Sequence, residues 1–177
     1  MSHKRKIVVG ISGASGIHLG LKTLELLPDD IDKHLIMSKN SKLVLSKELN
    51  GVTKYKNSDI AAAVASGSFG VDAMIITPCS MNTLGKIACG ISDNLITRTA
   101  AVMIKEQKKL ILCVREMPFS AIALENMHKL AVLGVIIAPP IMAYYSEQES
   151  LQEMENFVVG KWFDLLNIEN NLYKRWE

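Results

Sequence analysis

Two polar turns are the first candidates for chemistry in this chain, one rich in glycine and serine and the other with serine, asparagine and threonine side chains. One runs from Ser12 to Gly16 and the other from Pro78 to Thr83, and each follows an apolar, β-branched run. Glycine lets the backbone approach a ligand closely, and the N–H groups at the start of a helix attract phosphate. We interpret the first turn as a phosphate site, with a plain tight turn as the alternative.

The second turn has two interpretations. Ser80 is a natural N-cap for the helix expected after it, and Asn82 and Thr83 are then ordinary polar residues of the first helical turn. Alternatively, these hydroxyl groups, the Asn82 amide and the N–H groups at the helix start bind a second polar part of a ligand. The residues alone leave both interpretations open.

Two cations share one face of a predicted helix. Arg98, Val102 and Lys105 are spaced as i, i+4 and i+7, so they form one stripe. A cationic pair on an otherwise apolar helix suggests a shared anion. The alternative is a solvated face on which the cations pair with Asp93 and Glu106.

Further candidates stand after later strands. Arg115 and Glu116 directly follow an apolar run, and a guanidinium group can contact phosphate through two hydrogen bonds. Together with Arg98 and Lys105, Arg115 favours an anionic ligand such as phosphate. Tyr145 follows a proline pair, where it forms either an aromatic wall or ordinary packing.

Other classes of chemistry lack their residues. The first turn does not match G-x-G-x-x-G, and Ser38 stands where an acidic residue would hold the ribose of a nicotinamide cofactor. The four histidines form no Ser/His/Asp or metal-ligand arrangement, so neither a serine hydrolase nor a metalloenzyme is expected. The three cysteines are widely spaced, which indicates reduced thiols in a cytoplasmic protein.

Short apolar strands alternate with longer helical patterns along the whole chain. We predict strands over residues 6–11, 33–37, 72–77, 110–114 and 135–138, with Pro78 ending the third. We predict helices over residues 16–27, 39–48, 83–88, 95–107, 120–133 and 151–166. Residues 50–56 receive no assignment, an Ala-rich turn or helix follows at 60–65, and residues 66–68 form a loop.

This order predicts an α/β fold, a doubly wound parallel sheet with helices on both faces. We expect one domain over residues 1–177, with residues 1–5 and the C-terminal tail at its periphery. Ligands bind such sheets beyond the carboxyl ends of the strands, where the strand order reverses. The candidate turns both lie at that edge.

Composition limits the partners. The 177 residues carry 20 Lys and Arg against 18 Asp and Glu, so nucleic acid is not an expected partner. No apolar run approaches the length of about 18 residues expected of a membrane-spanning helix, and the basic start of the chain breaks too soon into glycine and serine for a secretory signal. We expect a cytoplasmic protein with no membrane partner.

The candidate residues belong to a longer ordered series that resembles the UbiX flavoproteins, which are flavin prenyltransferases. The series runs from about residue 6 to residue 176 and comprises Gly13-Ala14-Ser15-Gly16, Met37-Ser38-Lys39, Pro78-Cys79-Ser80, Asp93-Asn94-Leu95, Thr97-Arg98-Thr99-Ala100-Ala101-Val102, Lys105-Glu106, Val114-Arg115-Glu116-Met117-Pro118, Leu124-Glu125-Asn126-Met127, Pro139-Pro140, Tyr145 and Arg175-Trp176. Each motif is modest by itself, and the ordered series is specific.

The resemblance implies a flavodoxin-like, Rossmann-like sheet that binds FMN, in a homo-oligomer of twelve subunits with sites at subunit interfaces. FMN would be held by Gly13, Ala14, Ser15, Ser38, Ser80, Met81, Asn82, Thr83 and Arg115. The phosphate of dimethylallyl phosphate would be surrounded by Arg98, Lys105, Glu116, Tyr145 and Lys161, with Trp176 helping to close the site. The catalytic residues would be Ser15, Glu48, Lys105 and Glu116, and no metal is required.

The implied reaction joins a five-carbon allylic group to N5 and C6 of reduced FMN as phosphate departs. Cations placed where the phosphate charge grows stabilise its departure. Glu48, with Ser15 or the released phosphate, is the candidate acceptor for the proton lost from C6. The prenylated FMN would serve a partner decarboxylase of the UbiD type.

Two departures from the family pattern concern affinity more than reaction type. Lys161 replaces an arginine that many members use, which gives up two-pronged phosphate contact. Met81 and Asn82 differ from several family versions of their turn.

Two rival functions share this fold. One is an FMN-dependent decarboxylase of a cysteinyl substrate, whose catalytic His and Met-Asn clamp are not evident here. The other is a flavin carrier without catalysis, which would not need Glu48, Arg98, Lys105, Glu116 and Tyr145 together.

Overall fold

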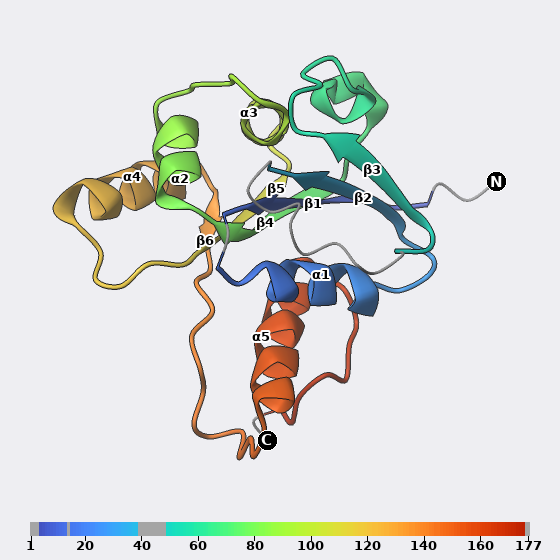
Figure 1. Ribbon diagram of the computed structural model, residues 1–177, viewed down its shortest axis with the longest axis vertical. Coiled ribbons are helices and arrows are strands. Elements are labelled where there is room, and N and C mark those ends of the chain that lie inside the picture. The colour runs from blue at the N-terminus through green and yellow to red at the C-terminus, as the bar shows by residue number, and fades with distance from the viewer. Residues whose placement is uncertain (1–3, 14, 39–48, 176–177) are drawn as a thin grey trace.

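The computed structural model describes residues 4–13, 15–38 and 49–175 (Figure 1). Its strands are β1 (Lys6–Ser12), β2 (Asp32–Met37), β3 (Val52–Lys56), β4 (Ala73–Cys79), β5 (Lys109–Val114) and β6 (Ile136–Ile137). Its α-helices are α1 (Ile17–Leu26), α2 (Met81–Ala88), α3 (Leu95–Lys105), α4 (Ala121–Val132) and α5 (Leu151–Leu165). Two 3-10 turns, Ala63–Ala65 and Gly67–Phe69, precede β4.

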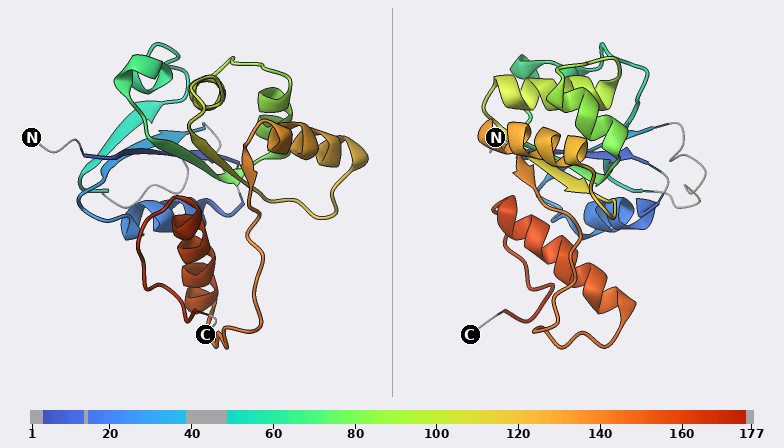
Figure 2. Two further views of the ribbon diagram at one scale, coloured as in Figure 1. Left: turned by 180° about the vertical axis from the view of Figure 1, so that it is seen from behind. Right: turned by 90° about the vertical axis from the view of Figure 1, so that its left-hand side faces the viewer.

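The strands form one parallel sheet in the order β3-β2-β1-β4-β5-β6. The views in Figures 1 and 2 show α1 and α5 on one face of this sheet and α2, α3 and α4 on the other. The predicted doubly wound parallel sheet is confirmed. Because the order reverses between β1 and β4, the carboxyl ends of these two strands form the switch point at which such sheets bind ligands.

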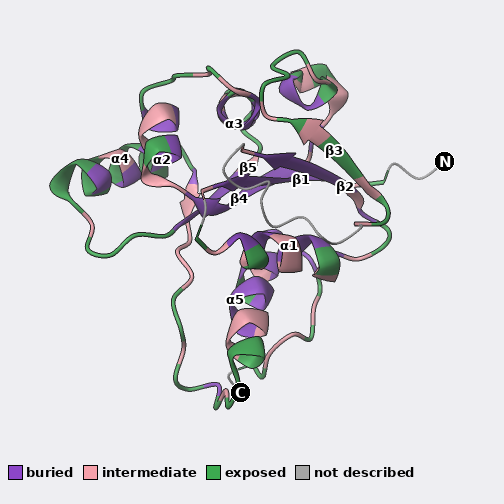
Figure 3. Ribbon diagram, in the orientation of Figure 1, coloured by how far each residue is buried: buried purple, intermediate pink, exposed green. Residues whose placement is uncertain are grey.

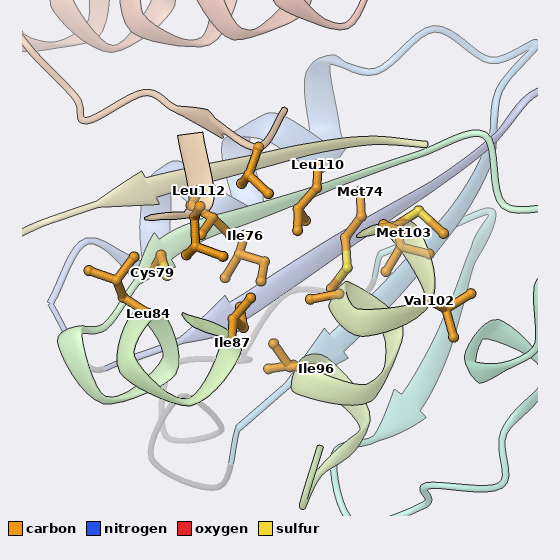
Figure 4. Close-up of a cluster of buried hydrophobic side chains, with 14 of the residues drawn as sticks. Met74, Ile76, Cys79, Leu84, Ile87, Ile96, Val102, Met103, Leu110 and Leu112 are labelled. Atoms are coloured by element: carbon orange, nitrogen blue, oxygen red, sulfur yellow. The ribbon is translucent and has the colours of Figure 1, made fainter. Parts of the chain in front are cut away.

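Both faces of the sheet are buried, which explains why most of its strands are continuous apolar runs (Figure 3). Alternate side chains of one strand enter two separate cores. In one core, Ile76 and Leu112 lie among buried residues of α2, including Leu84 and Ile87 (Figure 4). The other core fills the space between the sheet and the pair α1 and α5. The strands that carry the switch point are therefore rigidly held.

Sequence reasoning misses one strand and misplaces the end of another. β3 is an edge strand that pairs only with β2, and three of its five residues are exposed, so it lacks an apolar signal. The prediction that Pro78 ends its strand is wrong, because β4 continues to Cys79. The ladder to β5 shifts register between Ile76 and Cys79, which accommodates a proline that has no N–H to donate.

The other predicted elements agree with the structure to within a few residues. The Ala-rich segment forms only a short 3-10 turn, and a second one occupies residues 67–69, part of which was expected to be a loop. The helix predicted over residues 39–48 lies outside the described residues.

Candidate active site

The carboxyl ends of β1, β2 and β4 meet at the switch point through backbone hydrogen bonds. The Ser80 N–H donates to the Ser12 carbonyl at 3.0 Å and lies 3.2 Å from the Ser12 hydroxyl oxygen. The Ser38 N–H donates to the Ile11 carbonyl at 3.0 Å. Three segments that are far apart in the sequence are thus fixed at one edge of the sheet.

The turn after β1 packs closely against two other predicted site residues. Gly13 and Gly16 have φ angles of 138° and 86°, in the region that favours glycine. A Cβ atom at Gly13 would lie 3.6 Å from the Ser80 Cβ, and one at Gly16 would lie 3.4 Å from the Arg115 Cδ. We call Gly13, Ser15, Gly16, Ser80 and Arg115 the strand-edge cradle.

Helix α1 starts inside this cradle. Its N-cap is Gly16, which offers no side-chain acceptor, and no side-chain cap is seen among the described residues. A Cβ at Gly20 would lie 2.3 Å from the Thr77 carbonyl oxygen, so the glycine lets α1 pack directly on β4. The cradle therefore combines a helix N-terminus, which favours an anion, with the Arg115 guanidinium group at its rim.

The turn after β4 is used for capping. The Ser80 hydroxyl oxygen accepts from the Thr83 N–H at 3.3 Å, and the Ser80 hydroxyl donates to the Thr83 hydroxyl at 3.0 Å. The N-cap interpretation is therefore confirmed. Met81 is partly buried, Asn82 is exposed and Thr83 is buried, so Asn82 has the most accessible side chain of this first helical turn.

The stripe predicted on α3 is one face of that helix in the structure. Arg98, Val102 and Lys105 line a cavity of about 510 Å³ whose other wall is formed by residues 60–63 and 65–67. We call this the cation pocket. None of the residues of the strand-edge cradle lines it.

Two asparagines fix the start of α3. Asn94 forms a capping box with Thr97. The Asn57 carbonyl accepts from the Leu95 N–H at 2.8 Å, and the Asn57 side-chain oxygen accepts from the Ile96 N–H at 2.9 Å. Because Asn57 directly follows β3, the missed edge strand anchors the helix that carries the two cations.

The cations of the pocket are only partly neutralised. The Lys105 ammonium lies 2.8 Å from the Glu106 carboxylate, and this hydrogen bond lowers the pKa of Glu106. Both side chains are well exposed, so the pair contributes little to stability. Asp93 forms its ion pair with Lys86 and not with Arg98. The alternative of a solvated face with ion pairs to Asp93 and Glu106 therefore holds only for Lys105 and Glu106.

Glu116 lies in a different place from the cation stripe. It lines a second cavity of about 280 Å³ together with Met81 and Asn126, between the start of α2 and α4. A carboxylate oxygen of Glu116 accepts from the Met117 N–H at 3.2 Å. The predicted grouping of Glu116 with Lys105 is therefore not formed by the described residues of one chain.

Tyr145 and Lys161 lie in a fourth region. Tyr145 is in the loop before α5, and Lys161 is on α5. The Tyr145 ring packs edge-on against Phe157, with 5.9 Å between centroids. The Lys161 ammonium lies 5.7 Å from the centroid of the Tyr173 ring. Both predicted residues are exposed. The predicted residues Ala14, Glu48 and Trp176 are outside the described residues.

Ser12 and Pro78 belong to the candidate turns of the sequence, but neither was predicted as a site residue. Ser12 holds the Ser80 backbone, and Pro78 lies beside both glycines of the cradle. Residues 60–63 and 65–67 form the wall opposite Arg98 and were missed, since the Ser-Gly pair at 66–67 after an Ala-rich stretch was the only signal for them. Among the residues that the structure describes, no group of three or more His, Cys, Asp and Glu side chains is placed to hold a metal ion. No helix in the described part of the chain is both long and apolar enough to cross a membrane.

Comparisons with known proteins agree with this geometry. The model of the family described as Flavoprotein matches residues 1–162. The flavin prenyltransferase UbiX of Helicobacter pylori strain J99 is 48% identical over 183 aligned positions, which cover 97% of this chain and 98% of that protein.

Two solved structures are similar over almost their full length. A structure of AnUbiX (PadA1) in complex with FMN and dimethylallyl pyrophosphate has a TM-score of 0.90 at 37% identity, covering 99% of this chain and 98% of that one. A dodecameric FMN-dependent UbiX-like decarboxylase from Escherichia coli O157:H7 has a TM-score of 0.89 at 38% identity, covering 97% and 99%. With the full-length match to the Helicobacter enzyme, these likenesses show that the chain belongs to the UbiX family of flavin prenyltransferases.

Proposed function

We propose that this chain transfers a dimethylallyl group from dimethylallyl phosphate to reduced FMN, forming bonds at N5 and C6 of the flavin. The observation that carries the proposal is the strand-edge cradle at the switch point, in a chain whose 48% identical relative is a flavin prenyltransferase. Bound reduced FMN supplies the nucleophilic ring atoms, and the protein supplies orientation, charge and a proton acceptor.

The cradle fits a flavin phosphate. Gly13 and Gly16 leave open the space that side chains would fill beside Ser80 and Arg115. The Gly16 N-cap directs the first N–H groups of α1 at the same place, and Arg115 adds a guanidinium group that can contact phosphate twice. Gly13, Ala14, Ser15, Ser38, the residues Ser80 to Thr83 and Arg115 would hold FMN.

The departing phosphate of the allylic substrate needs cations where its charge grows. Arg98, Lys105 and Lys161 would supply them, and a hydrogen bond from the Tyr145 hydroxyl would add to the charge stabilisation. In one chain these residues lie in two regions, neither of which includes the cradle. We infer that cradle and cations from neighbouring copies form one site, in an assembly like that of the dodecameric Escherichia coli protein.

Proton transfer would be the task of carboxylates. Glu48, with Ser15 close by, would accept the proton released when the ring closes at C6. Glu116 would lie next to the leaving phosphate, and Trp176 would help to close the site. Glu48→Gln should therefore slow formation of the final product while FMN binding is unchanged.

The product would pass to a UbiD-type decarboxylase in the cytoplasm. Cys79, Cys89 and Cys113 are free thiols, as expected in a reducing compartment. The Escherichia coli relative is described as a decarboxylase, and this label would be explained if the decarboxylation were carried out by the recipient of the modified flavin.

Mass analysis of the flavin tests the proposal. Purified protein is incubated without oxygen with reduced FMN and dimethylallyl phosphate, and the flavin is extracted. We expect flavin heavier by one five-carbon unit, and less of this flavin from Lys105→Ala protein. Unmodified flavin from FMN-loaded wild-type protein, with the diphosphate as well as the monophosphate, would favour a decarboxylase or a carrier instead.

A further inference from the structure

The segment after α5 folds back along that helix and is held by one carboxylate. Asp164 Oδ1 accepts from the Arg175 guanidinium group at 2.8 Å and from the Asn170 amide at 2.9 Å. Asp164 Oδ2 accepts from the Tyr173 hydroxyl and, at 3.2 Å, from Arg175. We call Asp164, Asn170, Tyr173 and Arg175 the Asp164 clasp.

A glycine makes room for the returning segment. A Cβ at Gly160 would lie 2.5 Å from a ring carbon of Tyr173 and 2.9 Å from the side-chain oxygen of Asn170. The Gly160 carbonyl also accepts from the Asn170 amide at 3.3 Å. The surface of α5 is thus shaped to take the clasp residues in one arrangement.

The clasp connects the two predicted phosphate-binding residues of this region. The Tyr173 ring packs edge-on against Phe157 at 5.0 Å, and Phe157 packs edge-on against Tyr145 at 5.9 Å. Two cations also lie near the Tyr173 ring, the Arg175 guanidinium group at 5.2 Å and the Lys161 ammonium group at 5.7 Å from its centroid. Tyr145 and Lys161 come from different segments, and Tyr173 is the link between them.

The clasp also keeps Asp164 away from Lys161. The two residues are spaced as i and i+3 on α5, at which a helix commonly forms an ion pair. Asp164 instead uses both oxygens for Arg175, Tyr173 and Asn170. In the described part of the chain, no carboxylate lies within ion-pair distance of Lys161, so its charge is available to an anion.

The clasp persists at neutral pH. Burial and the neighbouring Asp164 carboxylate raise the pKa of Tyr173 to about 12, so its hydroxyl remains a donor. Burial would raise the pKa of Asp164, but hydrogen bonds from Arg175, Tyr173 and Asn170 outweigh it and lower that pKa. Asp164 is therefore ionised whenever the enzyme would meet its substrate.

We propose that the Asp164 clasp positions Lys161 and Tyr145 to bind the phosphate of the allylic substrate. This inference rests on the proposed function, which makes these two residues phosphate ligands. The clasp residues do not touch the reacting atoms, so they are positioning residues. The packing of α5 on the sheet depends on other side chains, such as the buried Phe163 and Trp162, so loss of the clasp leaves the fold in place.

The test compares Asp164→Asn and Tyr173→Phe with the control Glu169→Gln, an exposed carboxylate in the same returning segment. We expect the KM for dimethylallyl phosphate to rise about tenfold in Asp164→Asn and less in Tyr173→Phe, which keeps the ring. The kcat and the Kd for FMN should stay within about twofold of the wild type, and inhibition by inorganic phosphate should weaken as KM rises. Glu169→Gln should match the wild type.

Lys161→Met separates this proposal from the proposed function. If Lys161→Met leaves phosphate inhibition unchanged, the assignment of Lys161 as a phosphate ligand fails. If Lys161→Met weakens phosphate inhibition but Asp164→Asn does not, the clasp proposal is overturned. In the double variant, Asp164→Asn should add less than it does alone, because both changes act on the same phosphate contact. Full additivity would also overturn the proposal.

Discussion

The strand-edge cradle and the cation pocket are built in opposite ways. The cradle joins residues far apart in the sequence, since backbone bonds at the ends of β1, β2 and β4 bring Ser12, Ser38 and Ser80 together. The cation pocket arises from one helix, because Arg98 and Lys105 share a face of α3 by spacing alone. One region is the product of sheet topology and the other of helix periodicity.

The two regions also differ in how complete they are within one chain. The cradle places Ser80, Pro78 and Arg115 within 4 Å of the positions that side chains would take at Gly13 and Gly16. In the cation pocket the Lys105 side chain is 69% exposed and its one carboxylate partner is also on the surface. The exposed cations of the pocket are accessible to a second copy of the chain, which could complete the phosphate site proposed above.

The largest expected effect comes from removing both charges of the cation pocket. In Arg98→Met with Lys105→Met, kcat/KM for dimethylallyl phosphate should fall at least about 100-fold, because the leaving phosphate loses two cations. Fluorescence titration should show unchanged FMN binding. Lys108→Met, an exposed cation next to α3 outside the pocket, serves as the control. Loss of FMN binding in the double variant would mean that the two regions are not separate.

Filling the cradle with a side chain should instead weaken FMN binding. Gly16→Val places a branched side chain against Arg115 and Pro78, so FMN affinity should fall at least about tenfold. Gly90→Val is the matched control, because Gly90 also has a positive φ of 71° but nothing lies within 4 Å of its added Cβ. Both variants carry backbone strain of about 1–3 kcal/mol. Equal FMN affinity in the two would refute the cradle as the flavin site.

Removing the Ser80 cap of α2 tests whether this residue also contributes to FMN binding. Ser80→Ala should lower the free energy of unfolding by about 1 kcal/mol and weaken FMN binding, since Ser80 both caps α2 and borders Gly13. Ser150→Ala removes the equivalent cap from α5. It should cost a similar free energy in urea unfolding and leave FMN binding intact. If the two variants bound FMN equally well, Ser80 would have only its capping role.

The smallest effect concerns His34, which lies on β2 next to the 3-10 turn Gly67–Phe69. It is 3% exposed, packs edge-on against Phe69, and has Nδ1 at 3.2 Å from the Tyr55 hydroxyl. Its Nε2 is 3.2 Å from Asp32 but not in hydrogen-bonding geometry. Burial lowers the pKa of His34 below 6.5, with a smaller contribution from Lys6, although Asp32 opposes this.

Because the pKa of His34 is lower in the folded state, the unfolded state binds more protons as the pH falls below 6.5. Its contribution to stability is present above that pH and is lost below it. Urea unfolding between about pH 7 and pH 5 should show a decline that is shallower in His34→Gln. Hydrogen exchange should place the wild-type loss at residues 63–69 before residues 12–16. A steeper decline in His34→Gln would contradict this account.

The sequence predicted the features that depend on local patterns, namely hydrophobic periodicity and the residues that begin a helix. The α3 stripe, the Ser80 cap and the buried strands follow from helix spacing, a polar residue before an apolar run and continuous apolar runs. Features that depend on contacts between distant segments were not readable. β3 is polar because it is an exposed edge, Pro78 extends β4 by a register shift, and the fit of Tyr173 against Gly160 appears only once the chain folds back.

The most direct test of the shared site is to combine two impaired variants. Gly16→Val subunits carry a blocked cradle, and subunits with Arg98→Met and Lys105→Met carry an empty cation pocket. They are co-expressed with different affinity tags, the mixed assemblies are isolated through both tags, and prenylated flavin is measured by mass. We predict that the mixture forms product faster than either variant alone, since an intact cradle then meets an intact cation pocket. Mixed assemblies that bind FMN and form product no faster than either variant alone would contradict the account.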